Sequence, residues 1–213
     1  MGVVLCDLLC SSIERLNDFR DFTKPLILVS LILFFLRNKN KLSAIVTRLL
    51  FFGLLFSLIG DVLLLFAVRA QLFFMMGLFA FLIAHIMYIL IFLEKRNKQQ
   101  KNTIFLMFTI LYGIALFCLL YRGLGKLLIP VIIYMIVILL MSNASYLRKN
   151  SVSQVSYNQV FYGALFFMLS DSVLAYTEFC KPLFVQNIWI MISYAIAQLL
   201  IVKGILNQGK QVN

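Results

Sequence analysis

Long apolar segments separated by short polar and basic connections make up most of this chain. A bilayer core of roughly 30 Å needs about 20 helical residues to cross it. By this measure seven segments can each form a membrane-crossing helix, and no soluble domain fits between them. Their expected ranges are 25–36, 45–66, 72–93, 103–121, 127–146, 158–179 and 184–206. The pattern therefore predicts an all-α transmembrane helical bundle, with residues 1–213 as a single integral membrane domain.

The first 22 residues do not fit a complete span. Residues 1–12 are too short and too acidic to cross a bilayer, and they lack the basic start of a signal peptide. We expect residues 1–22 to form either an interfacial segment or a truncated first span, so the bundle has seven to eight spans. The segment 25–36 is itself short for a full crossing unless its helix begins near Asp21.

The composition agrees with a polytopic membrane protein. The chain is 63% apolar and 13% charged with a mean hydropathy of +1.00, whereas soluble domains are roughly 45–50% apolar and about 25% charged. These values exclude a soluble enzyme, a disordered chain and a disulfide scaffold. The four cysteines form no CxxC pair and have no histidine nearby, so we expect no metal site.

Basic residues strongly outnumber acidic ones, with 19 Lys and Arg against 8 Asp and Glu. In a hydrophobic chain this excess is typical of cytoplasmic loops rather than of a nucleic-acid surface. If the connections alternate, most basic residues fall on the side that holds the C-terminus. We therefore expect a multi-pass protein of the bacterial cytoplasmic membrane with a cytoplasmic C-terminus and no nucleic-acid partner.

Two parts of the chain resemble each other around an aspartate. Residues 55–64 read LFSLIGDVLL, and residues 165–174 read LFFMLSDSVL. The first and fifth segments also both begin near a proline, Pro25 and Pro130. The matching segments are four apart, an even number, so this register predicts two parallel four-helix repeats.

Only two acids, Asp61 and Asp171, lie well inside predicted spans. A charge in the membrane interior is expensive, so such residues usually have a function. At about 1.5 Å of rise per residue, both would lie roughly 8–12 Å from the outer ends of their helices. We therefore expect the two carboxyl groups to share one cavity open to the outer half of the membrane. Two carboxyl groups that retain one proton suit acid-catalysed hydrolysis, and they suit a proton relay equally well.

Further polar side chains in or beside the spans are candidates for supporting roles. His85 is the only histidine, and a lone buried histidine is more often a hydrogen-bond partner than a metal ligand. Tyr88 follows it by three residues and so lies on the same helical face. Lys24 stands at the outer start of the first segment, where its side chain could reach a lipid phosphate. The other candidates are Tyr134, Tyr194 and Gln198.

In six motifs the sequence resembles the YhhN-like lysoplasmalogenases, a family of multi-pass membrane vinyl-ether hydrolases. The motifs are residues 23–26, 56–64, 77–90, Pro130 with Tyr134, 163–174 and 193–199. The resemblance implies an eight-span enzyme that hydrolyses the vinyl ether bond of a lysophospholipid within the membrane, without a cofactor. The products would be a fatty aldehyde and a glycerophospho-alcohol. The family's two intramembrane aspartates correspond to Asp61 and Asp171, while its first span is missing or truncated here.

The expected reaction needs a general acid that protonates the outer alkene carbon and a carboxylate that stabilises the resulting cation. We expect Asp171 to be the acid and Asp61 the ionised partner. Lys24 would bind the lipid phosphate, and the side chains expected to position water are His85, Tyr88, Tyr194 and Gln198. The alternative function is a small secondary transporter that uses the two aspartates as a proton relay. A lipid hydrolase of other bond specificity is a further alternative, although a GxSxG elbow is absent from the sequence.

Overall fold

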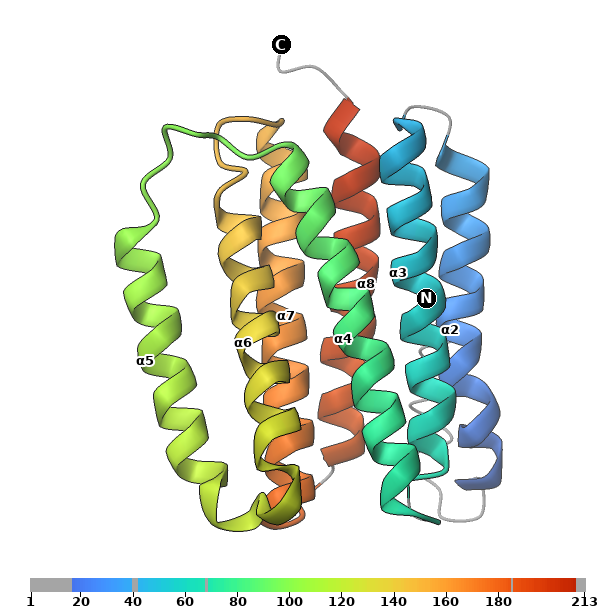
Figure 1. Cartoon of the computed structure of the whole chain (residues 1–213). Helices are drawn as coiled ribbons and strands as arrows, with labels where there is room; N and C mark the ends of the chain where they lie inside the picture. The colour runs from blue at the N-terminus through green and yellow to red at the C-terminus, as the bar shows by residue number, and fades with distance from the viewer. Residues whose placement is uncertain (1–16, 40–41, 68, 185, 210–213) are drawn as a thin grey trace. The chain divides into compact units, whose positions relative to one another are not determined.

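The computed structural model describes residues 17–39, 42–67, 69–184 and 186–209, with side chains described from Pro25 onward. Throughout these ranges every regular element is helical (Figure 1). The chain divides into two compact units. We call Met1–Met87 the N-terminal unit and Tyr88–Asn213 the C-terminal unit.

The N-terminal unit contains α2 (Asn17–Asn38), α3 (Ala44–Leu65) and most of α4 (Gln71–Glu94). Helix α2 begins before the segment expected from hydropathy and continues through Pro25. Residues 17–22 therefore belong to α2, while the expectation for residues 1–16 lies outside the described residues. Ser43 caps the start of α3, because its hydroxyl accepts a hydrogen bond from the Val46 N–H at 3.3 Å.

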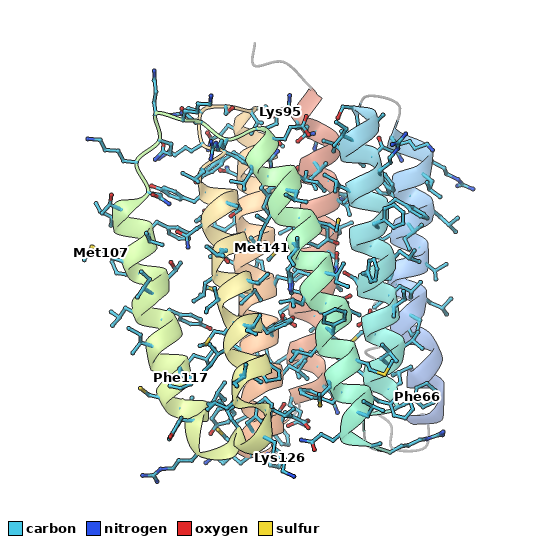
Figure 2. All side chains as sticks on the ribbon, viewed as in Figure 1. Phe66, Lys95, Met107, Phe117, Lys126 and Met141 are labelled. Atoms are coloured by element: carbon cyan, nitrogen blue, oxygen red, sulfur yellow. The ribbon has the colours of Figure 1, made fainter. Side chains whose placement is uncertain are left out.

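The C-terminal unit takes in the end of α4 and four further long helices. These are α5 (Thr103–Leu120), α6 (Leu128–Tyr146), α7 (Gln154–Phe179) and α8 (Gln186–Leu206). Two short 3₁₀ turns, η3 (Tyr121–Gly123) and η4 (Gly125–Leu127), connect α5 to α6, and η5 (Asn207–Gly209) follows α8. Lys95 and Lys126 lie at opposite ends of this unit, as Figure 2 shows.

The helices have the lengths and compositions of membrane spans. Among the described residues, six are long and apolar enough to cross a bilayer, and Pro25–Asn38 is a shorter apolar helix. Large apolar side chains such as Met107 on α5 are exposed, as expected where lipid surrounds the protein. The chain is thus a multi-pass helical membrane protein, and the fold class predicted from hydropathy is confirmed.

Two glycines allow α7 and α8 to pack closely. A Cβ atom on Gly163 would lie 2.9 Å from Cγ1 of Ile201, and one on Gly204 would lie 2.6 Å from Cγ2 of Val160. Real Cβ contacts are longer than this, so any larger residue would push the two helices apart. Close backbone approach through small residues is the common way for helices to associate in membranes.

The substitution Gly204→Leu is therefore expected to destabilise the protein by about 1–3 kcal/mol, because the added side chain overpacks the contact between α7 and α8. Thermal unfolding of the purified protein in detergent measures this change. Lys203→Leu is the matched control, since it adds the same side chain at the exposed neighbouring position. Equal unfolding midpoints for the two variants would contradict the packing argument.

Candidate active site

Asp61 lies in the second half of α3 and is only 1% exposed. It continues the buried face of the helix, because the buried Ser57 precedes it by one turn. The backbone beside it is tightly packed: a Cβ on Gly60 would lie 2.7 Å from two ring carbons of Phe81 on α4. Glycine at position 60 therefore lets α4 approach the turn of α3 that carries the carboxyl group.

His85 belongs to the same region of the N-terminal unit. Helices α3 and α4 are antiparallel, since Gly60 approaches Phe81 while Gly77 approaches Leu64. This register places His85 near the level of Phe56, about 7–8 Å along the helix axis from Asp61. The histidine is completely buried. His85, the only histidine of the sequence, and Asp61, one of the two predicted catalytic acids, therefore lie in the same part of the α3–α4 pair.

Asp171 lies in α7, where three consecutive polar residues are held by three different helices. Tyr134 of α6 donates a hydrogen bond from its hydroxyl to Oδ2 of Asp171. Tyr112 of α5 donates to the Ser172 hydroxyl at 2.6 Å, and the Ser170 hydroxyl donates to the Ile190 carbonyl of α8 at 3.1 Å. Consecutive helical residues point about 100° apart, so a Ser-Asp-Ser sequence can reach α8, α6 and α5 in turn.

A second buried polar group of the C-terminal unit joins α4 and α8. The Tyr88 hydroxyl donates to Oε1 of Gln198 at 2.7 Å, and Nε2 of Gln198 donates to the Tyr194 hydroxyl at 3.3 Å. The Tyr194 ring packs edge-on against Phe167, one turn before Asp171, with the ring centroids 5.4 Å apart. Three of the predicted supporting residues therefore form one hydrogen-bonded group.

An apolar groove of about 320 Å³ lies between α5 and α7. It adjoins the Ser-Asp-Ser sequence, because Ser172 is part of its wall. The Ser172 hydroxyl is engaged by Tyr112 and by the Met168 carbonyl, which leaves hydrocarbon as the main lining. The residues around the groove are Leu116, Leu119, Ser172, Val173, Tyr176 and Leu183.

The structure brings together some of the predicted site residues but not all of them. Tyr134 joins Asp171, while Tyr88, Tyr194 and Gln198 join one another. Asp61 and Asp171 belong to different units, so their sharing of one cavity stays a prediction. The Lys24 side chain lies outside the described residues.

Three residues of the site were missed by the sequence analysis, namely Tyr112, Ser170 and Ser172. A signal for the two serines was present, since they flank an aspartate inside an otherwise apolar span. No comparable signal marks Tyr112. As for metals, the described His, Cys, Asp and Glu side chains form no group of three or more that could hold an ion.

A family model described as the YhhN family matches residues 19–205, a range that begins in α2, ends in α8 and contains both aspartates. Neither a curated protein nor a solved structure matches the chain.

Proposed function

The chain belongs to the YhhN family, and we propose that it hydrolyses the vinyl ether bond of lysoplasmalogens to a fatty aldehyde and a glycerophospho-alcohol. The main support is the placement of Asp171, a carboxyl group inside a membrane span that accepts a hydrogen bond from Tyr134. A second acid, Asp61, is buried in another span. Two acids within membrane helices are costly, and catalysis gives a reason for both.

The proposed reaction begins with protonation of the substrate. The acidic proton of Asp171 moves to the outer alkene carbon, whose π electrons form the new C–H bond, and an oxocarbenium ion results. The Asp61 carboxylate stabilises this cation and takes a proton from the water that attacks it. The hemiacetal hydroxyl then gives its proton to the Asp171 carboxylate as the C=O bond of the aldehyde forms. The bond to the glycerol oxygen breaks, and this oxygen takes the proton held by Asp61, so both acids return to their starting states.

Tyr134 is proposed as a positioning residue for Asp171. Its hydroxyl bonds to Oδ2 and so holds the carboxyl group in one orientation. Hydrogen bonds to charged groups contribute roughly 1.5–3 kcal/mol, and Asp171 becomes a charged carboxylate as its proton moves to the substrate. Tyr134→Phe is therefore expected to lower kcat/KM about ten- to hundredfold.

The matched control for this prediction is Tyr112→Phe, which removes a hydroxyl that bonds to Ser172 and not to the acid. Both variants should fold, because each keeps the aromatic ring. The pH dependence of kcat/KM should change for Tyr134→Phe alone. Equal losses and equal pH profiles in the two variants would contradict the positioning role.

The groove between α5 and α7 is proposed to hold the hydrocarbon chain of the substrate, because its wall is apolar and begins one residue after Asp171. Val173→Phe would fill part of it. We expect kcat/KM for a substrate with a long alkenyl chain to fall roughly tenfold relative to kcat/KM for a substrate with a short chain. This is the loss expected when two methylenes are removed from an apolar contact. Leu169→Phe is the control, since this exposed residue of α7 does not line the groove. The same chain-length preference in both variants would contradict the assignment.

The reaction itself is tested by comparing two lipids. Purified protein is incubated with an alkenyl lysophospholipid and with its saturated alkyl-ether counterpart, and free fatty aldehyde is measured. We expect aldehyde from the alkenyl lipid alone, because a saturated ether has no alkene carbon to protonate. No aldehyde from a folded protein would contradict the proposed function.

A further inference from the structure

Arg148 follows the C-terminal end of α6, and its long side chain is completely buried. Its Nη2 donates to the Ser156 hydroxyl of α7 at 3.3 Å and to Oε1 of Gln208 in η5 at 3.0 Å. The guanidinium carbon also lies 5.7 Å from the centroid of the Phe92 ring of α4. Three parts of the C-terminal unit therefore hold this cation at one end of the helices.

The positive charge of Arg148 has no anionic partner in the described part of the chain. Its Nε and Nη1 atoms are buried and make no hydrogen bond there, and none of the described acids forms an ion pair with it. Burial lowers the pKa of Arg148 to about 10, so the side chain is still charged at neutral pH. A buried charge without a counter-charge is strongly unfavourable, which makes an anion the expected complement.

The neighbouring connection adds further positive charge. The Asn97 N–H donates to the Leu147 carbonyl at 2.7 Å, and Nδ2 of Asn97 donates to the Lys149 carbonyl at 3.1 Å. These bonds tie the connection between α4 and α5 to the residues on either side of Arg148. The connection carries exposed basic side chains at its start, one of which is labelled in Figure 2; they are Lys95, Arg96 and Lys98.

The helix ends beside Arg148 do not offset its full charge. Helix N-termini carry a partial positive charge of about half a unit, and the first turn of α7 contains no acidic residue to offset it. Ser156 lies in this turn and donates to the Gly204 carbonyl near the end of α8 at 2.7 Å. The C-terminal ends of α6 and α8 each supply an opposing partial charge of about half a unit, so the helix ends together offset only part of the charge of Arg148.

We propose that Arg148 is the centre of a phosphate-binding site in the C-terminal unit, between the end of α6 and the start of α7. Its Nε and Nη1 supply N–H donors of the kind that bind phosphate oxygens. The ligand is either the phosphodiester of an anionic membrane lipid or inorganic phosphate, which present the same oxygens. Because both nitrogens are buried, an anion must displace neighbouring side chains to reach them, and binding should then stabilise the folded protein.

The test measures thermal unfolding with two probes. Inorganic phosphate is added to the detergent-purified protein, with chloride at equal ionic strength as the reference. In parallel, the protein is placed in phosphatidylcholine bilayers with and without phosphatidylglycerol. We expect either inorganic phosphate or phosphatidylglycerol to raise the unfolding midpoint of the wild type. The probe that does so identifies the source of the phosphate group.

Three substitutions locate the response. Arg148→Gln is expected to weaken the apparent affinity for the active probe at least about tenfold, while Lys149→Gln, which removes the same charge from an exposed neighbour, keeps it. Arg148→Lys retains the charge without the planar donor array, so it gives a measurable variant if the glutamine protein does not fold. It should weaken binding roughly tenfold as well.

Three results would overturn the proposal: neither probe stabilises the wild type, Arg148→Lys binds as tightly as the wild type, or Lys149→Gln loses as much affinity as the Arg148 variants. The last result would assign the effect to diffuse surface charge. None of these measurements depends on the proposed hydrolysis, so the two proposals can fail separately.

Discussion

Replacement of Asp171 by asparagine is expected to lower aldehyde release from an alkenyl lysophospholipid by about a thousandfold, the usual scale for loss of a general acid. The asparagine side chain has the same size but no acidic proton to give to the alkene carbon. Its carbonyl oxygen can still accept the hydrogen bond from Tyr134 that the carboxyl group accepts. The variant should therefore fold with an unfolding midpoint close to that of the wild type.

Glu178→Gln is the matched control for this loss. Glu178 is an exposed acid near the end of the same helix, so the substitution removes a carboxyl group without touching the proposed site. Activity should be unchanged. If Asp171→Asn keeps its activity while Glu178→Gln does not, the acid has been assigned to the wrong residue.

Replacement of Asp61 by asparagine should lower the same activity by about a hundredfold or more, because the neutral amide cannot balance the oxocarbenium ion. Asp61→Glu should also be impaired. The residue is 1% exposed and follows Gly60, where α4 leaves little space, so an added methylene moves the carboxylate from its place. Unchanged kcat/KM in both variants, measured with folded protein, would remove Asp61 from the mechanism.

Combining the two asparagine substitutions tests whether the two carboxyl groups act on one substrate. Residues that act as a unit have strongly non-additive effects. The double variant should therefore lose little more activity than Asp171→Asn alone. Multiplicative losses would indicate that Asp61 and Asp171 work independently and do not share a cavity.

The helices were largely predictable because each apolar segment is long enough to span a bilayer. The start of α7 was not: hydropathy placed it near Asn158, whereas the helix begins at Gln154. The Ser153 hydroxyl accepts a bond from the Ser156 N–H at 3.3 Å, and this cap fixes the helix start among polar residues. Pro25 likewise lies inside α2 and does not begin it.

Individual polar residues of the site were predictable, but their partners were not. Asp171 and Tyr134 can be recognised in the sequence as polar residues inside apolar spans. The hydrogen bond between them, however, depends on which faces of α6 and α7 meet. That choice rests on helix packing, for example at Gly163 and Gly204. Arg148 shows the same limit, since sequence counting treats it as a loop cation and the structure buries it.

The proposed hydrolysis begins with protonation of the alkene carbon of a vinyl ether. The most direct measurement is the mass of the aldehyde released from an alkenyl lysophospholipid in deuterium oxide. Carbon protonation places a single deuterium on the carbon next to the aldehyde group, and unlabelled aldehyde incubated with the protein corrects for exchange. We expect singly labelled aldehyde from the wild type and none from Asp171→Asn; aldehyde without this label, or no aldehyde from folded wild-type protein, would contradict the mechanism.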